Sequence, residues 1–393
     1  MGKKHEEKEA LVGQVEVKAM QDVDAIEKEN RKEAVKKAEK DAKKKSKKVD
    51  KKGKKKDKEK DSKDESVIEP IRDKKQVDPL IARPYKKIDI DAYRAKEGEK
   101  IDLTKYATTC DVKIDKDKTK TEYMLGLQAR LQDLQERLYA ENEYGLIVVL
   151  QGMDAAGKDG TVKHVFSSMN PAGINVSSFK QPSVEEKDHD YLWRINKNLP
   201  GRGEIGIFNR SQYEDVLVTR VHDLVDKGNL LKKLVKKDIW QERYEQINNW
   251  ETYLNQNGFP MVKIFLHLSK EEQRKRLVER IIEKEKNWKF SVSDVNERQY
   301  WNEYQHCYED LLAHTSTELS PWYIVPADNK WYTRYVVANI VYQALKKINP
   351  KMPKLSKDME ERLKMFKKLI MEHSDETLMQ IEKQIEQESS ASK

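Results

Sequence analysis

Residues 146–160 read LIVVLQGMDAAGKDG, and this stretch decides the fold. Its first five residues are aliphatic and largely β-branched, which is typical of a strand buried on both faces of a parallel sheet. Gly152 to Lys158 match the pattern G-x-x-x-x-G-K, and a stretch that can form a helix follows from Thr161 to Met169. Strand, loop and helix in this order predict a phosphate-binding loop, because loop N–H groups and a helix start surround an anion with positive potential.

Within this loop, Lys158 can reach the terminal phosphates of a bound chain. Asp159 stands where Ser or Thr usually holds magnesium. Asp154 is therefore a candidate magnesium ligand in its place, since that ion prefers hard oxygen ligands; the alternative is that Asp154 caps the turn. A glycine-rich turn with a chance lysine is the other interpretation, but the flanking strand and helix favour a phosphate site.

Further strand and helix patterns alternate along the chain. Strands are predicted at residues 174–179, 204–209, 261–268 and 322–326, and helices at 119–144, 188–199, 238–257, 270–284, 294–314 and 331–348. This alternation predicts an α/β fold with a parallel sheet covered by helices on both faces. Ligands then bind at the edge where the strands end, beside the loop. Residues 81–109 carry prolines and scattered apolar residues, and we expect them to wrap onto this domain.

The composition divides the 393 residues into three parts. Residues 1–80 are rich in Lys, Glu and Asp and hold no aromatic residue, so they are predicted to be a disordered or partly helical extension. The alternative is a basic arm that binds a polyanion, but sequence-specific binding of nucleic acid is not expected without aromatic residues for base stacking. Residues 81–349 form the predicted catalytic domain, and residues 350–393 a charged helical tail.

The strand at residues 204–209 ends in a second polar motif. The segment EIGIFNRSQYED spans residues 204–215, and Asn209 stands where a phosphate-binding-loop enzyme usually has a metal-binding Asp. An amide oxygen can orient a magnesium-bound water but cannot act as a base. Arg210 has the planar fork that binds phosphate; the alternative is an ordinary ion pair with Glu214 or Asp215.

A third charged segment, RKRLVERIIEKEKNWK, covers residues 274–289. Arg276 and Arg280 are four residues apart and so share one helix face. This segment is either a lid that closes over phosphates or an exposed charged helix. The net charge of +8 is compatible with a polyanionic partner.

Compartment is inferred from the cysteines and from hydropathy. Cys110 and Cys307 are far apart and fit neither a disulfide framework nor metal spacing, which favours a reducing compartment. No apolar run is long enough for a membrane span, and the first ten residues lack the apolar core of a secretory signal. We therefore expect a cytoplasmic protein without a membrane partner.

Several long motifs, in order, closely resemble the polyphosphate kinase 2 family. They are GMDAAGKDGTVKHVF, KQPSVEEKDHDYLWRINKNLPGRGEIGIFNRSQYEDVLVTRVH, EKNWKFSVSD and PWYIVPADNKWYTRYVVANIVYQAL, and the resemblance covers about residues 81–348. It implies a thymidylate-kinase-like fold with a phosphate-binding loop, Mg²⁺ as cofactor, and transfer between polyphosphate and nucleotides. The FNRS-x-YED form is similar to class III of the family, whose members phosphorylate both AMP and ADP. Gln212 departs from the His that is usual there.

The resemblance also assigns roles to residues. Lys158 and Asp154 would belong to the Walker A site, Asn209 and Arg210 to the Walker B site. Phosphate or nucleotide would be bound by Gly152, Gly157, Gly160, Lys180, Arg194 and Glu214, and the lid would carry Arg276, Arg280 and Lys289. Family members are commonly oligomeric, so the resemblance implies a homo-oligomer.

These arguments predict a magnesium-dependent enzyme that transfers the terminal phosphoryl group of inorganic polyphosphate to AMP or ADP, with guanine nucleotides open as further acceptors. The nearest alternative is a nucleoside monophosphate kinase that uses ATP, since the fold and the loop would be the same. A nucleic-acid-binding protein with a vestigial loop is a third hypothesis. Removal of residues 1–80 tests it, because an accessory arm should leave nucleotide phosphorylation intact.

Overall fold

The computed structural model describes residues 67–68, 81, 83–225 and 230–372. Residues 270–297 belong to one compact unit and the remaining described residues to another. Apart from Val67 and Ile68, the predicted extension at residues 1–80 lies outside the described residues, as does the tail beyond residue 372.

The larger unit is built on five parallel strands in the order β4-β5-β3-β6-β7. Their bounds are β3 Leu146–Gln151, β4 Ile174–Ser178, β5 Ile205–Asn209, β6 Met261–His267 and β7 Trp322–Pro326. All five strands were predicted to within one residue at each end. The strand before the phosphate-binding loop, β3, lies at the centre, and all of its residues are buried.

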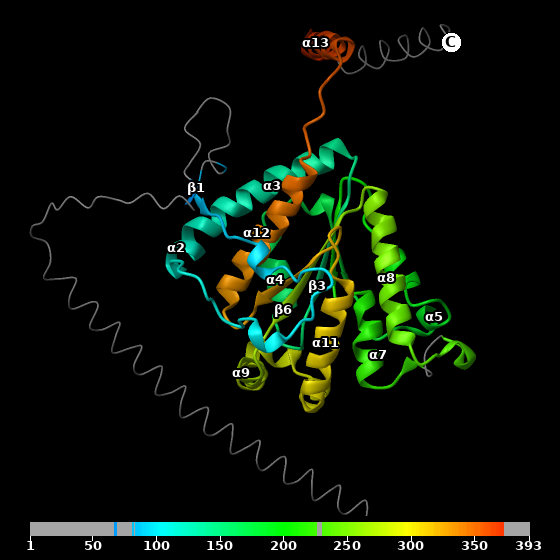
Figure 1. Cartoon of the computed structure of the whole chain (residues 1–393). Helices are drawn as coiled ribbons and strands as arrows, with labels where there is room; N and C mark the ends of the chain where they lie inside the picture. The colour runs from blue at the N-terminus through cyan, green and yellow to red at the C-terminus, as the bar shows by residue number, and fades with distance from the viewer. Residues whose placement is uncertain (1–66, 69–80, 82, 226–229, 373–393) are drawn as a thin grey trace, which may run out of the picture. The chain divides into compact units, whose positions relative to one another are not determined.

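Helices cover both faces of this sheet and make an α/β/α sandwich (Figure 1). One face packs on α3 (Met124–Glu141), α4 (Lys158–Val165) and α12 (Lys330–Ile348); the other packs on α8 (Ile239–Gln256) and α11 (Trp301–Thr315). Along β3 the side chains alternate between the two cores. Leu146, Val148 and Leu150 enter the first core, and Ile147 and Val149 enter the second, as the period of two requires.

The segment before α3 lies along the edge strand β7. The backbone N–H of Ala95 donates to the carbonyl of Trp322 at 2.9 Å, and Arg94 bridges to Tyr323. Tyr85 and Tyr93 enter one core, and Ile101 enters the other. The predicted wrapping of residues 81–109 is thus confirmed, and it covers an edge that would otherwise expose unpaired backbone groups.

Several short elements of the larger unit precede β3 in the sequence. They are β1 (Val67–Ile68), antiparallel to β2 (Tyr85–Lys86), the 3-10 turns η1 (Asp91–Tyr93) and η2 (Leu103–Lys105), α2 (Lys116–Lys118) and the π-helical turn η3 (Thr119–Tyr123).

The predicted helix at residues 188–199 is wrong. The structure has α5 (Val184–Lys187) and α6 (Trp193–Asn196) instead. Ser183 and Glu186 form a reciprocal capping box that starts α5 early, and the Asp190 side chain then accepts from the backbone N–H of Leu192 and turns the chain again.

Further helices differ from prediction in their bounds. The helix predicted at 119–144 begins with the π-helical turn η3 and ends at Glu141. The helix after the loop, α4, begins at Lys158 rather than Thr161. The predicted helix at 294–314 is divided into α10 (Val292–Glu297), the 3-10 turn η9 (Arg298–Tyr300) and α11. The remaining turns are η4 (Pro171–Gly173), η5 (Gln212–Val216), α7 (Val218–Val221) and η7 (Lys232–Leu234).

The smaller unit contains α9 (Lys270–Ile282), η8 (Lys284–Lys289) and α10. The tail begins with α13 (Lys357–Glu372). Cys110 and Cys307 are both free thiols. Among the described helices, none combines the length and apolar character that crossing a membrane requires.

Candidate active site

The phosphate-binding loop occupies residues 152–157, between β3 and α4. Gly152 lies so close to β6 that a Cβ there would stand 2.9 Å from the carbonyl oxygen of Leu266. Gly157, directly before α4, has a φ of 103°, in the region that favours glycine. Ala155 has a φ of 62°. These bends curl the backbone at the end of the central strand, with the start of α4 facing the same space, so the geometry of an anion cradle is present.

Lys158 is buried at the first position of α4, with 8% of its surface exposed. Its Nζ donates to the carbonyl oxygens of Gly152, at 2.6 Å, and Met153, at 3.3 Å. Burial, together with the positive charge of Arg210, lowers the pKa of Lys158 to about 8, although nearby carboxylates oppose the shift. The two cations therefore lie close enough for the charge of Arg210 to act on Lys158.

This lowered pKa predicts how polyphosphate affinity depends on pH. The protonated form of Lys158 is the one that binds an anion, so the apparent affinity should be constant below about pH 8. Above pH 8 the dissociation constant should rise by up to about tenfold per pH unit. Equilibrium binding of polyphosphate between pH 6.5 and 9.5 measures this, and K158R, whose guanidinium does not titrate in this range, should remove the dependence. If the polyphosphate affinity of the parent protein stays constant up to pH 9.5, Lys158 is not the residue that binds the anion.

The second motif meets the loop through the sheet. Asn209 at the end of β5 pairs in register with Leu150 of β3, and the N–H of Arg210 donates to the carbonyl of Leu150 at 3.0 Å. The Nδ2 of Asn209 donates to Oδ1 of Asp159 at 2.7 Å. The structure thus brings the Walker A and Walker B candidates into contact.

Arg210 turns sharply away from the strand, with a φ of 67°. Its Nη2 donates to Oδ1 of Asp154 at 2.8 Å, and its Nη1 lies 3.6 Å from Oε2 of Glu214. An ion pair with Glu214 was the alternative to the phosphate-binding role, and the structure contains it. The pairing with Asp154 was not foreseen; it fixes a guanidinium directly beside the loop.

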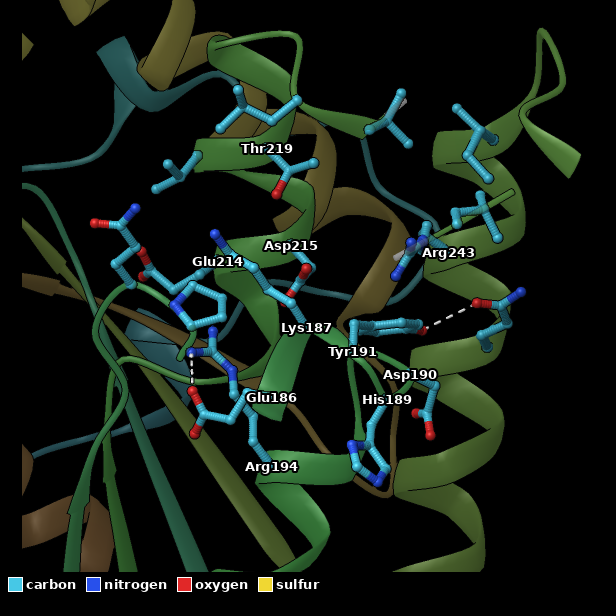
Figure 2. A pocket seen from close by; sticks show the side chains of 18 of the residues that line it. Glu186, Lys187, His189, Asp190, Tyr191, Arg194, Glu214, Asp215, Thr219 and Arg243 are labelled. Atoms are coloured by element: carbon cyan, nitrogen blue, oxygen red, sulfur yellow. Dashed lines mark hydrogen bonds and ion pairs between the residues drawn. The ribbon is translucent and has the colours of Figure 1, made fainter. Parts of the chain in front are cut away.

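A cavity of about 1050 Å³ opens next to Arg210 (Figure 2). Its apolar wall comes from Val218, Leu224, Val225, Leu230, Leu234 and Ile239. Its polar lining includes Lys180, Glu214 and Arg194, all three of which were predicted to bind phosphate or nucleotide. The buried Arg194 donates to the carbonyl of Lys180 at 2.7 Å and lies 3.8 Å from a carboxylate oxygen of Glu186.

Asp215 and Arg243 are two of the charged residues of this cavity that were missed as site residues. Asp215 follows Glu214 in η5, and burial raises its pKa to about 6, while Arg243 and Arg194 oppose the shift. Arg243 of α8 lies over the ring of Tyr191, with the guanidinium carbon 3.9 Å from the ring centre. Figure 2 shows Asp215, Tyr191 and Arg243 at the same side of the cavity. Asp215 lies in a motif that the sequence singles out, but nothing in the sequence signals that the charge of Arg243 on α8 acts on it.

Gly160, which was predicted to bind phosphate or nucleotide, lies close to a further cation. It lies in the first turn of α4, and a Cβ there would stand 3.5 Å from Nη2 of Arg334. Arg334 belongs to α12, so this helix supplies one more cation beside the start of α4. Sequence reasoning missed it, because α12 reads as an ordinary core helix.

The three lid candidates lie in the smaller unit. Arg276 pairs with Glu272 at 2.9 Å on α9, and Arg280 pairs with Asp294 and donates to the carbonyl of Lys289 at 3.3 Å. Their predicted helix is present, and Arg276 and Arg280 share it. Their role as a lid stays a prediction.

The sequence profile of the family described as Polyphosphate kinase 2 matches residues 113–353. The chain is 49% identical over 226 residues to the ADP-polyphosphate phosphotransferase of Rhodopseudomonas palustris, which covers 57% of this chain and 78% of that protein. It is 45% identical over 232 residues to the AMP/ADP-polyphosphate phosphotransferase of Meiothermus ruber, which covers 59% of this chain and 83% of that protein.

A solved structure extends the similarity to the fold. The crystal structure of Polyphosphate Kinase 2 from Arthrobacter aurescens is 37% identical, with a TM-score of 0.64, and the match covers 70% of this chain and 95% of that one. The family profile spans the loop, the second motif and the whole parallel sheet. This chain therefore belongs to the polyphosphate kinase 2 family.

Proposed function

We propose that this protein transfers the terminal phosphoryl group of inorganic polyphosphate to adenine nucleotides, converting AMP to ADP and ADP to ATP. The observation that carries this proposal is the contact between the loop and the second motif. Lys158 and Arg210 lie beside one backbone cradle, and a large cavity opens next to Arg210. The names of the two relatives, which contain polyphosphate and either ADP alone or AMP and ADP, support it.

The donor would be held by the loop. Phosphoryl transfer needs cations around the moving group and aligned reactants, with little covalent work by the protein. Lys158 would exchange its bonds to the Gly152 and Met153 carbonyls for phosphate oxygens, and Arg210 would bind a phosphate with its planar fork. A chain of many phosphates would extend from this point toward further cations, and Arg334 of α12 is one of them.

The acceptor would lie in the cavity. Pockets for small molecules are usually about 300–1,000 Å³, mostly apolar, with a few polar groups that fix orientation. This cavity has that character: an apolar wall faces Arg194, Arg243 and Asp215. The acceptor phosphate would point to Arg210 at the loop end, and the nucleoside would pack against the apolar wall.

Magnesium fits the donor chemistry of the loop. Asp154 and Asp159 carry carboxylates beside it, one bonded to Arg210 and the other to Asn209. Mg²⁺ in phosphate sites commonly takes one or two carboxylates and completes its shell with phosphate oxygens and water. We therefore assign these two residues as its holders. Bound there, the ion would neutralise charge on the phosphate chain.

No general base is needed in this proposal. The second pKa of a phosphate monoester is about 6, so the attacking oxygen of AMP or ADP is already ionised at neutral pH. Asn209 cannot take a proton, and its amide instead donates to Asp159. The protein would contribute alignment and charge, which are the main terms in this chemistry.

The choice of donor separates this proposal from an ATP-dependent nucleoside monophosphate kinase. Purified protein is given AMP with either polyphosphate or ATP, and ADP formation is measured. We expect ADP with polyphosphate and at most a small fraction of that rate with ATP; the reverse result overturns the proposal. Adding ADP and GDP as acceptors in the same assay tests the class III assignment and the preference for adenine.

A bulky substitution tests the acceptor cavity. L234W should raise KM for AMP and ADP by about tenfold, because the indole would occupy space against the apolar wall, and it should leave KM for polyphosphate unchanged. Leu234 is 46% exposed, so the change does not disrupt the core. L231W is the matched control, since Leu231 precedes the same turn, is 59% exposed and does not line the cavity. Equal effects of the two substitutions contradict the placement.

The lid, the homo-oligomer and an accessory role for residues 1–80 complete the proposal. Arg276, Arg280 and Lys289 would close over the phosphate chain. Residues 1–80 would raise the local concentration of polyphosphate by long-range attraction, which predicts that their removal weakens binding at low salt only.

A further inference from the structure

A charged network is buried in the core beneath the second motif. Glu251 of α8 is 1% exposed and Lys263 of β6 is fully buried. The Lys263 Nζ lies 2.5 Å from Oε2 of Glu251 and donates to the carbonyl of Thr315 at 2.6 Å. Burial disfavours both charges, raising the pKa of Glu251 and lowering that of Lys263, while the attraction between the two opposes both shifts.

The other oxygen of Glu251 binds the turn that carries the site. Gln212 Nε2 donates to Oε1 of Glu251 at 3.1 Å, and Tyr213 Oη donates to the same atom at 2.7 Å. Lys263 Nζ also lies 3.0 Å from Tyr213 Oη. Gln212 and Tyr213 are consecutive, and both are fully buried.

These two residues stand between the functional side chains of the turn. Arg210 precedes them with a left-handed φ, and Glu214 and Asp215 follow them. A left-handed non-glycine residue persists only where its surroundings hold it. The anchored side chains of Gln212 and Tyr213 supply such a hold, because they tie the turn to the interior at two adjacent positions.

The network also reaches a helix that lines the cavity. Glu251 lies on α8, about two turns beyond Arg243, which lines the cavity. One carboxylate therefore connects the turn that bears Arg210 with the helix that bears Arg243. Apolar side chains of similar volume often stabilise a core as well as a buried ion pair does. Stability alone thus gives no reason for this polar arrangement at this place.

We propose that Glu251 is a positioning residue for phosphoryl transfer: its carboxylate, held by Lys263, fixes the 212–213 pair and so sets Arg210 against the acceptor cavity. The inference rests on the proposed function of the same site. A misplacement of about 1 Å in such a constellation can reduce the rate about 10²-fold, so the network bears on kcat more than on substrate binding.

The test separates positioning from stability. E251L leaves Lys263 buried without its partner and should lower the melting temperature. The double variant E251L/K263M replaces the pair by apolar groups and should restore the melting temperature close to that of the parent. Its kcat should nevertheless stay about 10- to 100-fold below the parent, with KM for polyphosphate changed less than about threefold. A double variant with parental stability and parental kcat overturns the proposal.

Substitutions of Gln212 keep the proposal testable if the double variant does not fold. Q212H retains an N–H donor toward Glu251 and should keep kcat within about threefold of the parent, whereas Q212L, which has no donor, should reduce kcat about tenfold. Equal kcat for the two contradicts the network. N339L is the matched control, because Asn339 is a fully buried polar residue of α12 in the other core. The kcat of N339L should equal that of the parent.

Measurements on the parent enzyme separate this test from the test of the proposed function. If the parent makes ADP from AMP with ATP but not with polyphosphate, the proposed donor is wrong, and the ratios of kcat between variants and parent are then measured with ATP. The positioning claim is judged only on those ratios.

Discussion

Replacing Lys158 by alanine should lower kcat/KM for polyphosphate by at least about 10³-fold while the protein stays folded. The reason is that Lys158 combines burial with a position at the mouth of the loop, so no solvent cation can substitute for it. The assay is ADP formation from AMP and polyphosphate, with thermal unfolding measured on the same preparation.

The structure explains why folding should survive this change. A folded-state pKa of about 8 against an ordinary 10.5 means that the protonated lysine is destabilised in the fold. That penalty, about 3 kcal/mol at most, is fully present below pH 8 and disappears as the pH rises toward 10.5. Replacing Lys158 by alanine removes this penalty at pH 7. The resulting gain in stability offsets the loss of packing by the aliphatic part of the side chain.

Lys163 provides the control for this substitution. It lies on the same helix, α4, and is exposed. K163A should therefore keep parental activity. If K158A still transfers phosphate, or if K163A loses as much activity as K158A, the loop does not take part in the reaction.

The strands could be predicted because burial leaves a clear mark on them. β3, β5, β6 and β7 are buried along their whole length, so each reads as a mainly apolar run with sharp ends, interrupted in β6 by Lys263. The helix predicted at residues 188–199 failed for the opposite reason. Local hydrogen bonds of Ser183 and Asp190 set the turns there, and they compete with an apolar pattern that is weak.

The site was predictable to the extent that its residues lie in the two sequence motifs that end β3 and β5. Lys158, Asn209 and Arg210 follow strands that are neighbours in the sheet, so their meeting is a consequence of the parallel topology. Arg243, by contrast, enters the cavity from α8, and Arg334 reaches α4 from α12. Such contacts depend on how helices pack, and no periodicity of a single sequence specifies them.

Asp154→Asn should reduce kcat about 10²-fold and raise the Mg²⁺ concentration needed for half-maximal activity about tenfold or more. The asparagine keeps the size of the side chain but loses the charge that attracts both Arg210 and a cation. The measurement is activity against Mg²⁺ concentration at saturating polyphosphate. D133N is the matched control, because Asp133 makes a similar pair with Arg137, at 2.9 Å, on the outside of α3.

A second readout of the Asp154 variant checks that the charge of Asp154 acts on Lys158, whether or not Asp154 holds magnesium. The negative charge of Asp154 is one of the causes that hold the pKa of Lys158 up. In the variant the pKa of Lys158 should fall below 8. The pH above which polyphosphate affinity declines should therefore be lower than in the parent. A loosened, more solvated loop would instead raise this pH. An unchanged Mg²⁺ dependence means that Asp154 holds no magnesium and only caps the turn, whatever the pH profile shows. If both the Mg²⁺ dependence and the pH profile shift, then Asp154 acts on the metal and on Lys158 together. Transfer to an acceptor that is already ionised requires such a grouping of charges around the phosphate chain.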